Sequence, residues 1–220
     1  MIPSGRAPRG IEVWFAPLAA TDTAVEAGLA TLAREERVRA SRLHLPADRR
    51  RFVVSHAALR AALADRTGLA LPAIEVRYGP CGKPWVAGGG RLEFSMSRAG
   101  EVAAFAFATS PVGIDIVAMS SGARLLEAAP EFCSPAELDS IGDLTRSRRM
   151  EALARAWTRK EALLKATGEG LTRSPAGVPV MQDPRCAAGE CIVRVAGRTW
   201  RIQDVPAPTG YRSALAHRLP

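Results

Sequence analysis

The sequence is poor in the residues that build metal clusters and disulfide frameworks. Its 220 residues include four cysteines, at positions 81, 133, 186 and 191, and three histidines. No C-x2-C pair occurs, and no histidine lies at zinc-ligand spacing from a cysteine. We therefore expect free thiols in a reducing cytoplasm and structural roles for His44, His56 and His217.

Long hydrophobic runs are also missing. Residues 1–10 lack the apolar region of a secretory signal, and the most apolar stretch, 102–117, is interrupted by Pro111 and Asp115. We therefore expect a cytoplasmic protein that does not span a membrane. Hydrophobic residues make up 47% of the chain and charged residues 24%, which is typical of a globular protein with a proper core.

Basic residues outnumber acidic ones, which gives a net charge of +8. A positive balance favours anionic partners, either nucleic acid, a phosphorylated small molecule or an acidic protein. Binding of single-stranded nucleic acid usually needs aromatic residues between the basic ones, and only Phe52 interrupts the arginine-rich stretch at 34–60. We therefore expect no nucleic-acid partner, and a solvated basic helix face explains the stretch equally well.

Hydrophobic periodicity predicts long helices at 46–67 and 146–167 and a further helix at 29–44. Each long helix precedes several short segments with strand patterning. The strands are predicted at 11–16, 74–79, 83–88, 92–97, 102–108, 112–117, 191–197, 199–205 and 211–217. Because this order occurs twice, we predict an α+β fold made of two similar α/β halves, 1–109 and 110–220, with a ligand in the cleft between them.

Two acids stand where apolar residues are expected. At about 100° per residue, Glu161 falls in the apolar stripe of its helix between Trp157 and Leu164, with Lys165 at the edge of that face. Asp115 has an isoleucine on each side in a predicted strand. Either acid suits an ordinary ion pair or a backbone amide. Together they suit Mg²⁺, which proteins hold with one or two carboxylates plus substrate phosphates.

Two predicted turns offer groups for an anion. Lys83 and Pro84 lie in the turn at 78–86, which lacks the spacing of a P-loop. Ser97 and Arg98 end a predicted strand, and their hydroxyl and guanidinium groups suit a phosphate. Each turn is also typical of an ordinary polar surface.

The order of these segments resembles that of the Sfp-type 4'-phosphopantetheinyl transferases. The specific element is W-x-x-K-E-A-x-x-K followed by glycines, at 157–170. The other matching stretches are "RRRFVVSHAALRAAL" at 49–63, "GKPW" at 82–85, "FSMSRAG" at 94–100 and "GIDIV" at 113–117.

The resemblance implies a monomeric pseudo-dimer with coenzyme A and Mg²⁺ in its central cleft. It implies transfer of 4'-phosphopantetheine from coenzyme A to a serine of an apo acyl or peptidyl carrier protein, with release of adenosine 3',5'-bisphosphate. The carrier would belong to fatty acid, polyketide or nonribosomal peptide synthesis, including secondary metabolism.

The resemblance also assigns roles to individual residues. Asp115 and Glu161 match the metal ligands, and Glu161, Lys165 and Asp115 are the implied catalytic residues. The implied coenzyme A contacts are Arg51 at the 3'-phosphate, Lys83 and Pro84 at the adenylate, Ser97 and Arg98 at a phosphate, and Lys160 and Lys165 at the pyrophosphate.

Two positions depart from the family pattern. Val117 stands where a second acid is common, so we expect weaker Mg²⁺ binding, and Arg98 stands where histidine is common. Arginine retains anion binding but offers no neutral imidazole. A non-catalytic relative that still binds coenzyme A is the alternative that these departures leave open.

Overall fold

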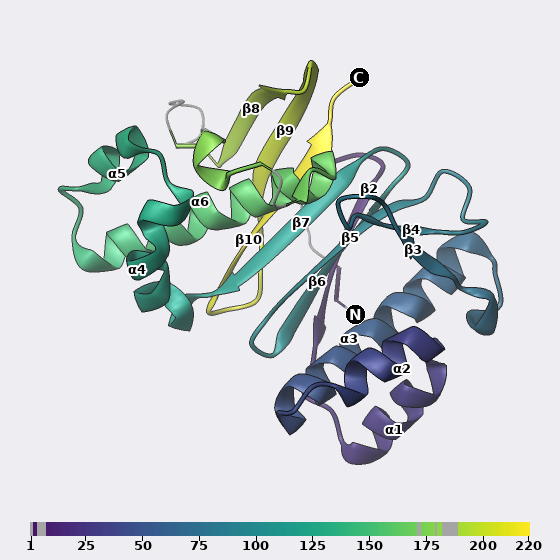
Figure 1. The fold of residues 1–220 in the computed structure, drawn as a ribbon. Coiled ribbons are helices and arrows are strands. Elements are labelled where there is room, and N and C mark those ends of the chain that lie inside the picture. Colours follow the sequence, from purple (N-terminus) through teal and green to yellow (C-terminus); the bar gives the residue numbers. More distant parts are fainter. Residues whose placement is uncertain (1, 4–7, 171–172, 179, 182–188) are drawn as a thin grey trace.

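Two antiparallel sheets of four strands form the centre of the described chain (Figure 1). The structure is a computed structural model that describes residues 2–3, 8–170, 173–178, 180–181 and 189–220. The first sheet contains, in spatial order, β1 (Ile2–Pro3), β2 (Ile11–Pro17), β6 (Val102–Ala108) and β5 (Glu93–Ala99). The second contains β7 (Val112–Ala118), β10 (Tyr211–Arg218), β9 (Arg198–Val205) and β8 (Glu190–Val195). A separate hairpin pairs β3 (Val76–Tyr78) with β4 (Pro84–Val86).

The two sheets share one strand order. In the first sheet, β2 precedes the helices and pairs with β6, which also pairs with β5. In the second sheet, β7 precedes the helices and pairs with β10, which also pairs with β9. This repetition agrees with the predicted α+β fold of two similar halves. The boundary predicted at 109/110 falls in the link between β6 and β7, and as a division between domains it stays a prediction.

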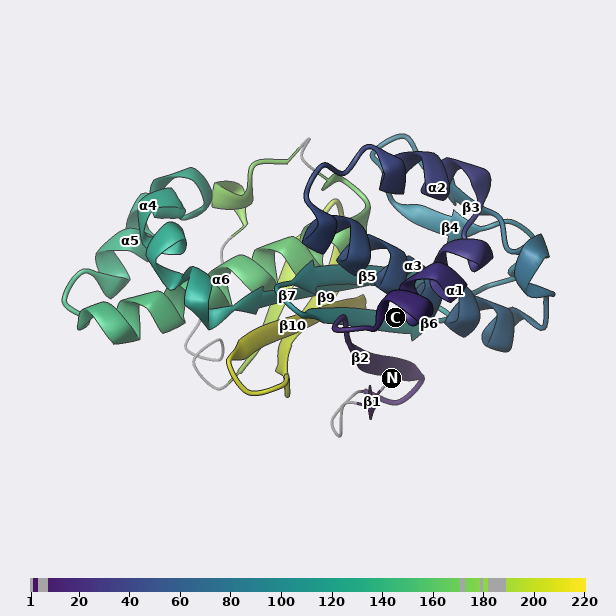
Figure 2. The same ribbon diagram turned by 90° about the horizontal axis from the view of Figure 1, so that it is seen from below.

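The helices gather in two groups at opposite ends of the molecule, with the strands between them (Figure 2). The first group contains α1 (Asp22–Thr31), α2 (Arg34–Ser41) and α3 (Pro46–Thr67). The second contains α4 (Gly122–Phe132), α5 (Pro135–Ile141) and α6 (Arg146–Thr167). None of the described helices is long and apolar enough to cross a membrane.

Both long helices have the bounds predicted from the sequence. They end at Gly68 and Gly168, whose positive φ values of 71° and 74° are the left-handed conformation that glycine tolerates best. The helix predicted at 29–44 is wrong as a single unit. It breaks at Leu32 and Ala33, which are extended, because Leu32 is buried and the Glu36 side chain accepts a hydrogen bond from the Ala33 amide to start α2.

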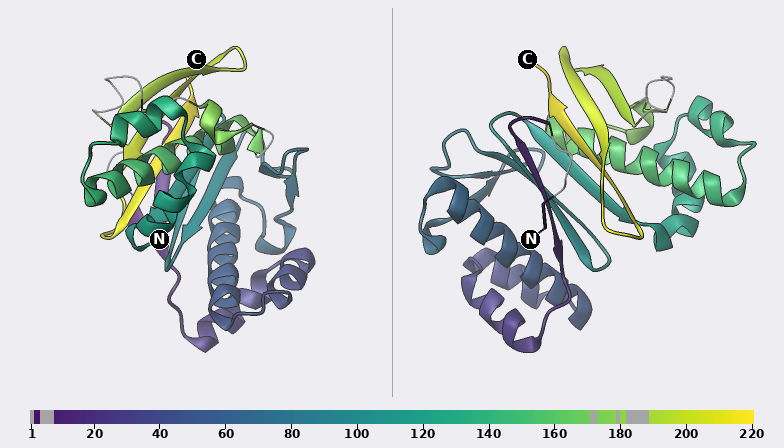
Figure 3. Two further views of the ribbon diagram at one scale, coloured as in Figure 1. Left: turned by 60° about the vertical axis from the view of Figure 1, so that its left-hand side comes forward. Right: turned by 180° about the vertical axis from the view of Figure 1, so that it is seen from behind.

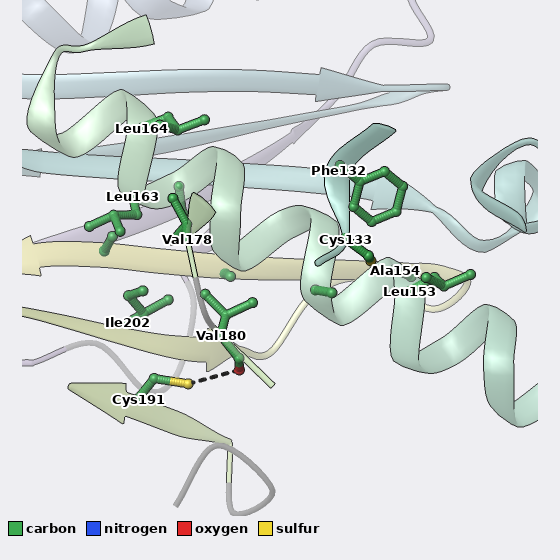
Figure 4. Packing of buried hydrophobic residues seen from close by; sticks show 14 of the residues in the cluster. Phe132, Cys133, Leu153, Ala154, Leu163, Leu164, Val178, Val180, Cys191 and Ile202 are labelled. Carbon is green, nitrogen blue, oxygen red and sulfur yellow. Dashed lines mark hydrogen bonds between the residues drawn. The ribbon is translucent and has the colours of Figure 1, made fainter. Parts of the chain in front are cut away.

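Three large clusters of buried side chains hold these layers together. One fills the space between α6 and the second sheet (Figure 4), and it includes Phe132, whose ring lies 5.1 Å from that of Trp157 in an edge-on contact. Another lies between α3 and the first sheet. A third joins the halves, because it combines Val13 of β2 with Ile114 of β7 and Leu215 of β10. Seen from behind, β2 and β10 lie in front of α6 (Figure 3).

The cysteines only partly match the prediction of free thiols. Cys81 and Cys133 are free, and burial raises the pKa of the Cys133 thiol to about 11, which keeps it protonated and unreactive. Cys191 is disulfide-bonded, so the prediction is wrong there. Cys186 lies outside the described residues.

The contact between β7 and α6 is the closest backbone approach that positions the site. At Gly113 of β7, an added Cβ would lie 2.0 Å from the carbonyl oxygen of Ala162 and 2.5 Å from the amide nitrogen of Ala166. Only glycine fits there. This tight contact between β7 and α6 therefore brings Asp115 of the strand close to Glu161 and Lys165 of the helix.

Candidate active site

Asp115 lies where the two halves meet. Its strand β7 is an edge of the second sheet, and β5, an edge of the first, lies beside it. The side chain is nearly buried, and its Oδ1 accepts hydrogen bonds from Lys165 Nζ at 2.6 Å and Ser97 Oγ at 2.6 Å. Its other oxygen, Oδ2, is buried and has no hydrogen-bond partner among the described residues. A buried carboxylate oxygen without a partner is costly, so this atom indicates a missing ligand.

Glu161 approaches the same place from α6. Burial and the charge of Asp115 raise the pKa of the Glu161 carboxyl, while Lys165, one turn further along the helix, opposes the shift. The two carboxylates thus face one another closely enough to repel, and Lys165 neutralises only part of their charge. Such a group of one lysine and two carboxylates is suited to a divalent cation or to proton transfer.

The residues present fit a hard cation. Carboxylate oxygens are the ligands that Mg²⁺ prefers, and the ion usually keeps waters and takes substrate phosphates as its other ligands. Within the described ranges, no three histidine, cysteine or acidic side chains form a group that could hold a metal by themselves. Val117, nearly buried, occupies the strand position where a third acid would stand. Asp115 and Glu161 would be the two protein ligands of such an ion, and the substrate or water would supply the others.

Two adjoining pockets open beside the residues that bind Asp115, since Lys165 lines both and Ser97 lines the second. The first, of about 270 Å³, is lined by apolar side chains such as Leu59 and Phe94 together with Lys83, Gly168 and Gly170. The second, of about 550 Å³, is more polar and is lined by Ser97 and Arg51 among others. The residues that line both pockets are Arg39, Met96, Arg98 and Lys165.

The shared wall carries most of the positive charge. The guanidinium groups of Arg39 and Arg98 lie 5.7 and 5.4 Å from the centre of the Phe52 ring, which is consistent with cation–π contacts. His56 stacks on the same ring at 3.8 Å, and burial lowers its pKa to about 4, so the imidazole is neutral at pH 7. Two arginines and Lys165 at the junction favour an anion that extends from one pocket into the other.

Lys83 and Pro84 lie in the wall of the first pocket, and their contact with coenzyme A stays a prediction. Lys83 Nζ donates to the carbonyl oxygen of Ala166 at 2.9 Å and pairs with Glu93 at 3.2 Å. Burial lowers the pKa of this ammonium group. Because Ala166 is in the last turn of α6, Lys83 also satisfies a terminal carbonyl of that helix and joins the two halves across the pocket.

Two residues of the predicted contacts, Arg51 and Lys160, are already paired with acidic side chains. Arg51 pairs with Glu101 and Asp48 at the edge of the second pocket, so its charge is already balanced. Lys160 is fully buried on the other side of α6 and pairs with Glu137 Oε2 at 2.7 Å. The prediction that Lys160 accompanies Lys165 is corrected here, because five residues turn a helix by about 500°, which leaves the two side chains about 140° apart.

Three further residues contribute to the site that sequence patterns did not indicate. Arg39 lines both pockets, and Ser95 and Ser213 bind the backbone around Asp115. One signal was available for Ser95, since it lies two residues before Ser97 on a strand and must face the same way. Nothing in the sequence indicates which distant residues Arg39 and Ser213 approach.

Comparison with known proteins identifies the family of this chain. Residues 111–216 match the model of the 4'-phosphopantetheinyl transferase superfamily. The 4'-phosphopantetheinyl transferase HetI of Nostoc sp. is 31% identical over 169 residues, which are 74% of this chain and 70% of HetI. A Synechocystis sp. protein provisionally named for the same activity is 31% identical over 165 residues, 73% of this chain and 66% of that protein. The 4'-phosphopantetheinyl transferase of Bacillus subtilis is 26% identical over 144 residues, 66% of this chain and 63% of the enzyme.

The fold and the site thus define a transferase of the superfamily matched by the second half of the chain. The protein belongs to the 4'-phosphopantetheinyl transferase family. The matched segments span about two thirds of these relatives' lengths.

Proposed function

We propose that this protein transfers the 4'-phosphopantetheine group of coenzyme A to a serine of an apo acyl or peptidyl carrier protein, with Mg²⁺, and releases adenosine 3',5'-bisphosphate. The observation that carries the proposal is Asp115. One of its carboxylate oxygens is held by Lys165, which lines both pockets, and by Ser97, which lines the second, and the other oxygen is buried without a partner among the described residues. Such an oxygen suits a metal ion that also binds a substrate phosphate.

The two pockets suit the two ends of coenzyme A. The first combines apolar walls with Lys83, Gly168 and Gly170, which suits an adenine nucleotide. The second, more polar pocket suits the pantetheine arm and the incoming serine. The pyrophosphate would then lie between them, beside Arg98 and Lys165, where positive charge is concentrated.

Each charged group has a role in this scheme. Lys165 and Arg98 bind the pyrophosphate oxygens and stabilise the charge that develops on the leaving group. Glu161, whose pKa is raised, accepts the proton of the serine hydroxyl as that oxygen attacks the phosphorus atom. Asp115 and Glu161 would hold Mg²⁺, which when bound neutralises phosphate charge and orients the pyrophosphate.

The test is intact-mass spectrometry of apo carrier proteins incubated with this protein, coenzyme A and Mg²⁺. We expect a mass increase equal to one phosphopantetheine group with the wild type and none with Glu161→Ala. Because Glu151 is also on α6 but pairs with Arg212 on the surface, Glu151→Ala is a matched control that should retain the activity.

Absence of modification across carriers of fatty acid, polyketide and nonribosomal peptide synthesis would contradict the transferase. If coenzyme A still bound to the protein in that case, as measured by calorimetry, the non-catalytic relative would be the correct interpretation.

A further inference from the structure

Two buried serine hydroxyls clamp the backbone at Asp115 from opposite sides. Ser95 Oγ, on β5, accepts a hydrogen bond from the amide of Ile114 at 3.1 Å. Ser213 Oγ, on β10, donates one to the carbonyl oxygen of Asp115 itself at 2.7 Å. Both serines are at most 5% exposed, so neither hydroxyl is a surface group that merely happens to be near.

Ser95 compensates for a missing ladder of backbone hydrogen bonds between β7 and β5. On one side β7 pairs with β10 along its whole length, but on the other it meets β5, which belongs to a different sheet. An amide that faces that side therefore needs a side-chain partner, and Ser95 provides it for Ile114. The position of Asp115 relative to the first sheet thus depends on the hydroxyl groups of Ser95 and Ser97.

We propose that Ser95 and Ser213 are positioning residues, which hold the Asp115 backbone so that its unpartnered Oδ2 stays in place for the metal ion. The inference rests on the proposed function, in which Asp115 binds Mg²⁺. Ser97 and Lys165 bind only Oδ1 of this side chain. Bonds to one oxygen do not fix the position of Oδ2, which therefore also depends on the position of the backbone. Removal of a group that orients a metal ligand commonly lowers metal affinity by about 10- to 100-fold.

The test uses Mn²⁺ as the probe, with its binding followed by electron paramagnetic resonance in the presence of coenzyme A. We expect Ser213→Ala to weaken Mn²⁺ binding about tenfold, and Ser95→Ala to do the same. Thr158→Val is the matched control, because it removes an equally buried hydroxyl that bonds only to carbonyls of its own helix. This variant should bind Mn²⁺ like the wild type.

A second measurement separates positioning from general damage. Coenzyme A affinity without metal, measured by calorimetry in the presence of a chelator, should stay within about twofold for Ser213→Ala, since Ser213 lines neither pocket. Equal losses of Mn²⁺ and coenzyme A binding in Ser213→Ala, or unchanged Mn²⁺ binding in both serine variants, would overturn the inference while leaving the transferase intact. A wild type that binds no Mn²⁺ would instead remove the metal from the proposed function, and this inference with it.

Discussion

The strictest test of the fold is the substitution Gly113→Ala. The new Cβ would lie 2.0 Å from the carbonyl oxygen of Ala162, whereas ordinary contacts begin at 3.4 Å. The difference, 3.4 − 2.0 = 1.4 Å, is the distance by which β7 and α6 must separate. Since the obstructing atoms are backbone, no side chain can rotate away to relieve the clash. Overpacking usually costs about 1–3 kcal/mol, and we expect at least about 3 kcal/mol here because the whole helix must move.

Urea denaturation followed by circular dichroism measures this loss directly. A loss of about 3 kcal/mol is a large part of the total of about 5–15 kcal/mol expected for a domain, and it lowers the melting temperature by about 6–12 °C. Gly177→Ala is the control, because an added Cβ meets nothing within 4 Å there, and it should be neutral. If the unfolding free energy of Gly113→Ala were within about 1 kcal/mol of the wild-type value, the close contact between β7 and α6 would be wrong.

Three further predictions follow from single side chains. Lys160→Met leaves Glu137 charged in the core and should lower the unfolding free energy by about 3–5 kcal/mol. The double variant Lys160→Met with Glu137→Gln should recover most of this loss. Equal urea midpoints for the single variant and the wild type would contradict the prediction. His56 has a folded pKa of about 4 against 6.5 when unfolded, so the unfolded chain binds the extra proton between these values. Stability should therefore rise by about 3 kcal/mol from pH 4 to pH 6.5, and denaturation of a His56→Phe variant should lack that rise. Lys165→Met should lower kcat at least about 100-fold through loss of charge beside Asp115; a kcat within threefold of the wild type would exclude its catalytic role.

The sequence predicted the elements and much of the site because both depend on local periodicity. An apolar stripe with a period of 3.6 residues defined α3 and α6, and alternation defined the strands. The spacing of four residues between Glu161 and Lys165 places both on one face of any helix, so their partnership did not depend on the tertiary structure. The pairing with Asp115 required a resemblance to a family, since a strand and a helix separated by 46 positions could meet in many ways.

Only the tertiary structure decided which partners the remaining polar groups have. Lys160 and Glu161 are adjacent in the sequence, yet Lys160 is buried against Glu137 and Glu161 lies near Asp115 and Lys165. In the sequence, Ser95 and Ser213 look like ordinary strand residues. Only the packed structure shows that both bind the backbone around Asp115. Local patterns fix which face of an element is apolar, but the partner of a buried polar group depends on how distant elements pack, and that is determined by the whole chain at once.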